Sequence, residues 1–236
     1  MRVLVIGGMH GNEPLGVAIV ELFQMNPVKN VDTVLANEIA IDANSRFVEQ
    51  DLNRLFPGNC NSKNYEPRRA AQLLALAKKY DTVLDFHNTY CQDNDCGFVG
   101  QSAGELLYKV AVSLGLRRVI LADYDCINKY APNCLSVEIS LDSGQNKPEV
   151  WYKRITQMSK LNNLDDDVGG LEKYHFVYRM TLEDRDKYAL LSKNLKAFEP
   201  ISNELAVKLG VVSPAYPIFI ADKFTPYNYG GLLNRL

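Results

Sequence analysis

The sequence lacks an excess of charge of either sign. It has 236 residues, with 26 Lys and Arg against 28 Asp and Glu, and a formal net charge of −2. A protein that binds nucleic acid or another polyanion needs a basic stripe, so we exclude nucleic acid as a partner. No apolar run is long enough to span a bilayer, and the stretch 3–6 is too short for a secretory leader. We therefore expect no membrane association, a cytoplasmic location and a small-molecule partner.

Cysteine and histidine are both scarce. The five cysteines, an odd number without a leader, indicate free thiols. Cys91 and Cys96 have the spacing C-x4-C, but no second pair accompanies them, which disfavours a cysteine metal site. The glycines after the first apolar run do not make G-x-G-x-x-G, and no G-x-x-x-x-G-K-[ST] occurs. A nucleotide-binding α/β protein is therefore the weaker reading.

Short apolar runs that alternate with helical patterns dominate the first two thirds of the chain. Predicted strands cover 3–6, 34–36, 82–86, 118–121 and 134–141. One predicted helix begins at Pro14, and two more cover 67–79 and 104–114. This order predicts an α/β fold with a mostly parallel or mixed central sheet flanked by helices.

The character of the sequence changes near residue 155. The stretch 162–170 is polar and turn-like, and beyond it short segments rich in Tyr, Val and Phe are separated by prolines. We predict a catalytic domain over 1–160 and a small β-rich C-terminal subdomain over 161–236.

Three residues are candidates for a metal site: His10, Glu13 and His87. His10 and Glu13 form H-x-x-E between a predicted strand and a predicted helix, and His87 follows the strand 82–86. Ligands of open α/β sheets bind at the carboxyl ends of the strands. Two imidazoles and one carboxylate make a zinc site with its fourth position open for water. A core or capping histidine is the alternative for each residue alone.

Two further carboxylates stand on predicted strands. Asp85 is two residues before His87, so both share a face, and Asp85 could hydrogen-bond a ligand imidazole or merely cap a turn. Glu138 shares a face with Ser136 and Ser140, which makes it the candidate general base. Strand reasoning alone favours an ordinary solvent-facing glutamate on an edge strand. Arg46, Asn53 and Arg54 offer carboxylate-binding groups.

Together these pieces resemble the aspartoacylase and succinylglutamate desuccinylase family, which has a zinc carboxypeptidase-like fold. The matching segments occur in the family's order along the chain: 7–13, 45–47 with 51–56, 85–89, 136–139 and 216–220. The first three are the specific ones.

The resemblance implies roles residue by residue. His10, Glu13 and His87 would bind one Zn²⁺ per chain, Glu138 would be general base and then acid, and Arg46 would steady the oxyanion. The family's α-carboxylate site and its C-terminal tyrosine would correspond to Asn53, Arg54 and either Tyr227 or Tyr229.

The sequence also departs from the family. Aspartoacylase has an arginine about ten residues before the catalytic Glu, and it grips the substrate's side-chain carboxylate. That place holds Asn128 here, beside Lys129, which could substitute only as a point charge. A family tyrosine slightly earlier in this segment would correspond to Tyr124.

These observations predict zinc-dependent hydrolysis of the amide bond of a small, N-acetylaspartate-like N-acyl amino acid. An N-succinylglutamate desuccinylase and a metallocarboxypeptidase are the alternatives, because both share the zinc site. The sequence does not fix the assembly, and a homodimer stays open.

Overall fold

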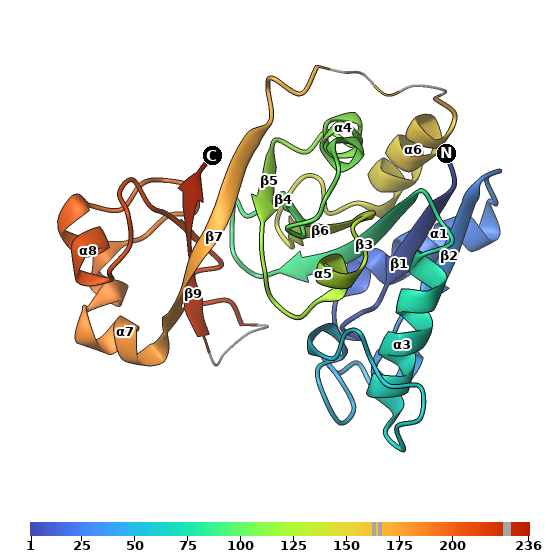
Figure 1. Ribbon diagram of the computed structural model, residues 1–236, viewed down its shortest axis with the longest axis horizontal. Helices are drawn as coiled ribbons and strands as arrows, with labels where there is room; N and C mark the ends of the chain where they lie inside the picture. The colour runs from blue at the N-terminus through green and yellow to red at the C-terminus, as the bar shows by residue number, and fades with distance from the viewer. Residues whose placement is uncertain (162–163, 165–166, 224–227) are drawn as a thin grey trace.

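The computed structural model describes residues 1–161, 164, 167–223 and 228–236. Within these residues one nine-stranded mixed sheet runs through the molecule in the order β2-β1-β3-β6-β4-β5-β7-β9-β8 (Figure 1). The strands are β1 Val3–Gly7, β2 Val31–Leu35, β3 Thr82–Thr89, β4 Cys96–Val99, β5 Arg118–Leu121, β6 Cys134–Ser140, β7 Glu172–Thr181, β8 Tyr216–Ile218 and β9 Asn228–Arg235. The predicted α/β class with a mixed central sheet is confirmed.

Helices connect the strands. The α-helices are α1 Pro14–Met25, α2 Glu38–Asp42, α3 Tyr65–Ala77, α4 Glu105–Ser113, α5 Ile127–Tyr130, α6 Pro148–Ser159, α7 Leu182–Lys187 and α8 Asn203–Lys208. Two short 3-10 helices are Leu52–Arg54 and Leu190–Lys193. The helical spacing after Pro14 and the predicted helices 67–79 and 104–114 correspond to α1, α3 and α4.

The sheet is parallel where the site lies. β2, β1, β3 and β6 run in one direction, and β4 pairs with β6 in the opposite direction. β6 is thus an interior strand, and the edge-strand alternative for Glu138 is wrong. β3 also continues past His87 to Thr89, because its pairing with β6 extends to Thr89 opposite Ser140. Parallel strands with both faces covered explain the nearly continuous apolar runs of β1 and β3.

Alternate residues of these strands serve two cores. Val3, Val5 and Phe86 pack into the core beneath α1, α4 and α6. Leu4 and Ile6 point to the opposite face, where α3 and α5 lie. Figure 1 shows α4 and α6 above the sheet and α3 below it. His87 and Val83 are four residues apart on β3, so their side chains point to the same face of the sheet. Val83 packs in the core on the α3 side, and the site therefore lies on that face.

The approach of α1 to β1 depends on two glycines. A Cβ built on Gly7 would lie 2.1 Å from the carbonyl oxygen of Gly16, and one built on Gly16 would lie 2.9 Å from the Cα of Gly7. Any side chain at either position would push α1 off the strand. This contact fixes where α1 begins, and therefore where Glu13 lies.

The C-terminal segment extends the sheet and adds its own core. β7 pairs in parallel with β5 and in antiparallel with β9, which in turn pairs with β8. Met180, Leu190, Leu205 and Leu232 belong to a separate apolar cluster around α7 and α8. The predicted boundary between 160 and 161 stays a prediction. No helix in the described ranges is long and apolar enough to cross a bilayer.

Candidate active site

Three buried side chains converge at the carboxyl end of β1. His10 lies in the loop after β1, Glu13 directly precedes α1, and His87 comes from β3. Nδ1 of His10 is 2.7 Å from Oε1 of Glu13, and Nδ1 of His87 is 2.8 Å from Oε2 of the same carboxylate. One donor atom from each residue lies within 4.8 Å of the others. The structure therefore brings together the three residues that the sequence nominated as metal ligands.

Each imidazole is also held from behind by a carboxylate. Nε2 of His10 is 3.1 Å from Oδ1 of Asp51, and Nε2 of His87 is 2.9 Å from Oδ2 of Asp85. A carboxylate in this position fixes the ring and its tautomer and raises the basicity of the nitrogen that faces a metal. Asp85 lies on β3 as expected, whereas Asp51 comes from the loop before the first 3-10 helix.

Opposite charges keep these buried groups ionised. Burial of Glu13 favours its neutral form, but His10 and His87 overcome this and hold its pKa well below the ordinary value. Burial alone would lower the pKa of His87, yet Asp85 and Glu13 raise it well above the usual range. Asp51 likewise has a lowered pKa, because contacts with His10 and Arg46 outweigh its burial. A carboxylate that stays anionic when buried is suited to hold a cation.

A divalent metal fits this donor set. Two imidazole nitrogens and a carboxylate, each oriented by a further hydrogen bond, form the ligand set of catalytic zinc sites. The three side chains are almost fully buried, with relative exposures of 3% for His10, 3% for Glu13 and 2% for His87. The three candidate ligands are thus shielded from bulk solvent, and His10 and Glu13 line the adjoining pocket.

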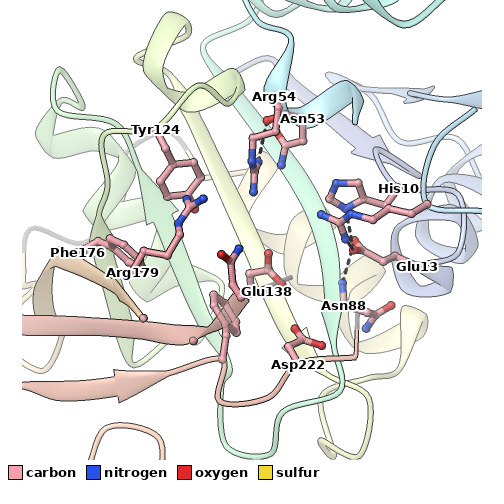
Figure 2. Close-up of a pocket in the computed structure, with 15 residues that line it drawn as sticks. His10, Glu13, Asn53, Arg54, Asn88, Tyr124, Glu138, Phe176, Arg179 and Asp222 are labelled. Atoms are coloured by element: carbon pink, nitrogen blue, oxygen red, sulfur yellow. Dashed lines mark hydrogen bonds and ion pairs between the residues drawn. The ribbon is translucent and has the colours of Figure 1, made fainter. Parts of the chain in front are cut away.

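Glu138 projects into the same pocket from β6. It pairs in register with His87 of β3 and with Cys96 of β4, which places it between those strands (Figure 2). Burial raises its pKa to about 8, and the nearby carboxylates of Glu13 and Asp222 act in the same direction. A carboxyl group with a pKa near neutrality can both accept and return a proton.

Arg46 lies at the edge of the metal-ligand cluster. Its Nε and Nη2 each donate a 3.2 Å hydrogen bond to Oδ2 of Asp51, and its Nη1 is 3.4 Å from Oε1 of Glu13. The guanidinium is therefore fixed by a fork on one side, and Nη1 is turned toward the ligands. Arg46 also lines the pocket.

Asn53, Arg54 and Tyr124 line the wall beyond Glu138. The Asn53 side-chain oxygen is buried and, among the described residues, has no hydrogen-bond partner. Arg54 donates to the Asn53 carbonyl oxygen at 2.8 Å, and its guanidinium carbon is 5.2 Å from the centre of the Tyr124 ring. These three predicted substrate-binding residues therefore share one wall.

Other predicted substrate residues lie elsewhere. Lys129 is exposed and outside the pocket, where it pairs with Asp123 and Asp125 at 3.4 and 3.0 Å. Tyr227 lies outside the described residues. Tyr229 is buried in the C-terminal apolar cluster.

Sequence reasoning missed several pocket residues. These are Asn88, Phe176, Arg179, Phe219, Asp222, Asn228, Gly230 and Gly231. All but Asn88 come from the C-terminal segment, and the local pattern around His10 or His87 could not indicate them. The matching segments 85–89 and 216–220 contain Asn88 and Phe219, but the resemblance gave neither residue a role.

The chain is similar to known proteins of one family. Residues 1–100 match the family described as Succinylglutamate desuccinylase/Aspartoacylase catalytic domain. A protein of Nostoc sp. named "Probable aspartoacylase" is 36% identical over 103 residues, covering 37% of this chain and 35% of its own. A rat protein named N-acyl-aromatic-L-amino acid amidohydrolase (carboxylate-forming) is 34% identical over 114 residues, covering 41% and 36%. The chain thus spans about a third of the length of these curated relatives.

A solved structure extends the likeness to the whole fold. The succinylglutamate desuccinylase of Chromobacterium violaceum superposes with a TM-score of 0.75 at 18% identity, covering 100% of this chain and 84% of that one. At this identity the likeness concerns the fold. The resemblance that the sequence motifs indicated is confirmed.

Proposed function

Because the first 100 residues of the chain belong to the succinylglutamate desuccinylase/aspartoacylase catalytic-domain family, we propose that the protein hydrolyses the amide bond of a small N-acyl amino acid with one bound Zn²⁺. The products are a carboxylic acid and a free amino acid. The observation that carries the proposal is that Glu138 lines the same pocket as His10 and Glu13 and pairs in register with His87, the third member of that cluster.

His10, Glu13 and His87 would hold the zinc. A zinc ion in such a site lowers the pKa of water and polarises a carbonyl group. Asp51 and Asp85 keep the two imidazoles in the orientation that presents Nδ1 to the ion, because each carboxylate accepts from the opposite nitrogen. The protein thus supplies both the ligands and their orientation.

Glu138 moves the proton. It accepts a proton from the attacking water and returns it to the amide nitrogen as the carbon–nitrogen bond breaks, so one water is consumed for each amide cleaved. Its pKa of about 8 suits both steps, since the group gains and loses a proton near neutral pH.

Arg46, Asn53 and Arg54 bind the substrate's oxygens. Arg46 presents Nη1 to the developing oxyanion while its other nitrogens remain on Asp51. Arg54 and the Asn53 amide bind the α-carboxylate, for which a guanidinium fork and a neutral amide are suited. The Arg54 guanidinium packs against the ring of Tyr124.

The test combines turnover with metal content. Wild-type protein is assayed on acetyl and succinyl derivatives of acidic, neutral and aromatic amino acids and on short peptides, and bound metal is quantified by mass spectrometry. His87→Ala should lose both zinc and activity. His175→Ala is the matched control, because His175 lies on β7 outside the pocket, and it should lose neither.

Two outcomes would contradict the proposal. Wild-type protein that takes up no zinc when zinc is supplied excludes the ligand assignment. Zinc-loaded protein that cleaves peptides but no N-acyl amino acid excludes the reaction, and it would instead support a metallocarboxypeptidase.

A further inference from the structure

The place from which aspartoacylase presents its second carboxylate-binding arginine cannot serve that purpose here. Asn128 is buried, and both polar atoms of its amide are hydrogen-bonded within the protein: Nδ2 donates to the Phe98 carbonyl oxygen at 2.6 Å, and Oδ1 accepts from the Ser136 hydroxyl at 2.8 Å. Lys129 is directed to Asp123 and Asp125 outside the pocket. Neither residue can meet a substrate.

A different arginine enters the pocket from the C-terminal segment. Arg179 lies on β7, and its guanidinium carbon is 6.0 Å from the centre of the Tyr124 ring, the same ring that Arg54 contacts at 5.2 Å. The two guanidinium carbons are therefore no further apart than the sum of these distances. Figure 2 shows Arg179 beside Tyr124 and Phe176, across Glu138 from His10 and Glu13.

These two arginines differ from Arg46 in their partners. Arg46 is tied to Asp51 and Glu13, whereas within the described part of the chain neither Arg54 nor Arg179 forms an ion pair with a carboxylate. The positively charged side chains of Arg54 and Arg179 thus both lie at the Tyr124 end of the pocket.

We propose that Arg179 and Arg54 together select a substrate with a second carboxylate in addition to its α-carboxylate. Arg54 takes the α-carboxylate and Arg179 the second one, which belongs either to the amino acid side chain or to the acyl group. The inference rests on the proposed deacylase function and specifies its substrate class. A planar guanidinium supported by an aromatic ring is suited to bind a carboxylate through two parallel hydrogen bonds.

Aromatic residues in the wall raise the competing case of an aromatic substrate. Their rings are already packed on one another: Tyr124 contacts Phe98 and Phe176 edge to face at 6.3 and 6.1 Å, and Phe219 stacks on Phe98 at 5.8 Å. Tyr124 also carries both guanidiniums. The rings therefore support the arginines, and the charge at this end favours an anion.

The experiment compares each acid with its isosteric amide. The values of kcat/KM are measured with N-acetyl-aspartate against N-acetyl-asparagine, N-acetyl-glutamate against N-acetyl-glutamine, and N-succinyl-alanine against N-succinamoyl-alanine, with N-acetyl-phenylalanine as the aromatic probe. We expect wild type to prefer at least one acid by about tenfold or more, because the neutral amide cannot form the charge-assisted pair of hydrogen bonds with a guanidinium. Which acid is preferred shows whether the second carboxylate belongs to the amino acid or to the acyl group.

Arg179→Gln identifies the residue responsible. It should lower kcat/KM for the preferred acid at least about tenfold more than for the matched amide, mainly through KM. Arg185→Gln removes a positive charge from the same segment, where Arg185 pairs with Asp186 on α7, and it should leave the preference intact. Arg179→Lys should restore only part of the preference, since an ammonium cannot form the fork.

Failure of this inference and failure of the proposed deacylation give different results. Equal turnover of acid and amide, a preference for N-acetyl-phenylalanine, or an unchanged preference in Arg179→Gln overturns the inference and leaves deacylation standing. If no compound is turned over, deacylation fails. Calorimetric binding of N-acetyl-glutamate and of N-succinyl-alanine then decides the inference: binding of either compound that Arg179→Gln weakens supports the second carboxylate site, and binding of both that is absent or unchanged in the variant overturns it.

Discussion

The backbone N–H of Leu15 donates a 2.9 Å hydrogen bond to the side-chain oxygen of Asn88, which belongs to β3. This bond caps the first turn of α1 from outside the helix. Glu13 occupies the N-cap position but makes no capping hydrogen bond, because its carboxylate is turned to His10 and His87. Asn88 thus caps the helix, and the carboxylate of Glu13 is left to act as a proposed metal ligand.

We predict that Asn88→Ala lowers both stability and metal affinity. Loss of a helix cap costs about 1 kcal/mol, and Asn88 also donates from its side chain to the Ile139 carbonyl oxygen. Urea unfolding of the metal-free protein should show the loss, and a zinc titration should show weaker binding. Asn26→Ala, at the exposed end of α1, is the control. Unchanged zinc affinity in Asn88→Ala would contradict the coupling between cap and ligand.

Glu138→Gln should separate metal binding from turnover. The amide has the size of the carboxyl group but cannot carry the proton, so kcat should fall by about 10²–10⁴-fold. Zinc content should stay near that of wild type, since Glu138 is not in the ligand cluster. Glu149→Gln, on the exposed side of α6, should retain full activity. A variant that keeps wild-type kcat would exclude Glu138 as the base.

Asp85→Asn should weaken zinc binding without removing a ligand. The carboxylate accepts from His87 and so fixes the ring that faces Glu13. Loss of such a partner lowers metal affinity by about 10–100-fold. Competition with a chromophoric chelator measures the affinity, and the exposed Asp142→Asn is the control. Equal affinities in Asp85→Asn and wild type would assign Asp85 to the fold alone.

The raised pKa of Glu138 predicts a pH dependence of stability in the metal-free protein. Burial shifts this pKa from 4.5 to about 8, so the folded state binds the proton more tightly than the unfolded chain. The stabilising contribution is fully present below 4.5 and is lost as the pH rises toward about 8. Glu138→Gln has no such proton, so it should become more stable relative to wild type over this interval.

Urea unfolding with a chelator, at pH values between about 5 and about 9, tests this sign. A constant difference between wild type and Glu138→Gln across the range would contradict the raised pKa. The opposite slope would indicate a carboxylate stabilised by His87 and Arg46, the two neighbours that act to lower this pKa.

Short-range sequence patterns predicted the elements that follow one another directly along the chain. The run from Val3 to Ile6, the glycines after it and the helix at Pro14 were sufficient to place His10 and Glu13, because a strand, a tight loop and a helix follow each other directly. The strand 82–86 placed His87 on the same sheet, although β3 proved longer than predicted. Alternation along β6 gave Glu138 the correct face.

Residues that arrive from distant segments could not be predicted. Thr89 donates to Asp222 at 2.7 Å across 133 positions of sequence, and no periodicity in either segment indicates this pairing. Arg179 lies on β7, whose place in the sheet depends on its pairing with β5 and β9. Sheet order is a property of the whole chain, so a single sequence shows the strands but not their neighbours.

The two walls of the pocket come from different parts of the chain. The proposed metal ligands lie within the first 100 residues, and Phe176, Arg179 and Asp222 come from the segment that β7 begins. Substitutions in the later segment should therefore alter which molecule is accepted while the proposed hydrolytic chemistry is preserved. Diversification of substrate choice among proteins of this fold could then proceed by exchange of one strand and its connections, at little risk to the reaction itself.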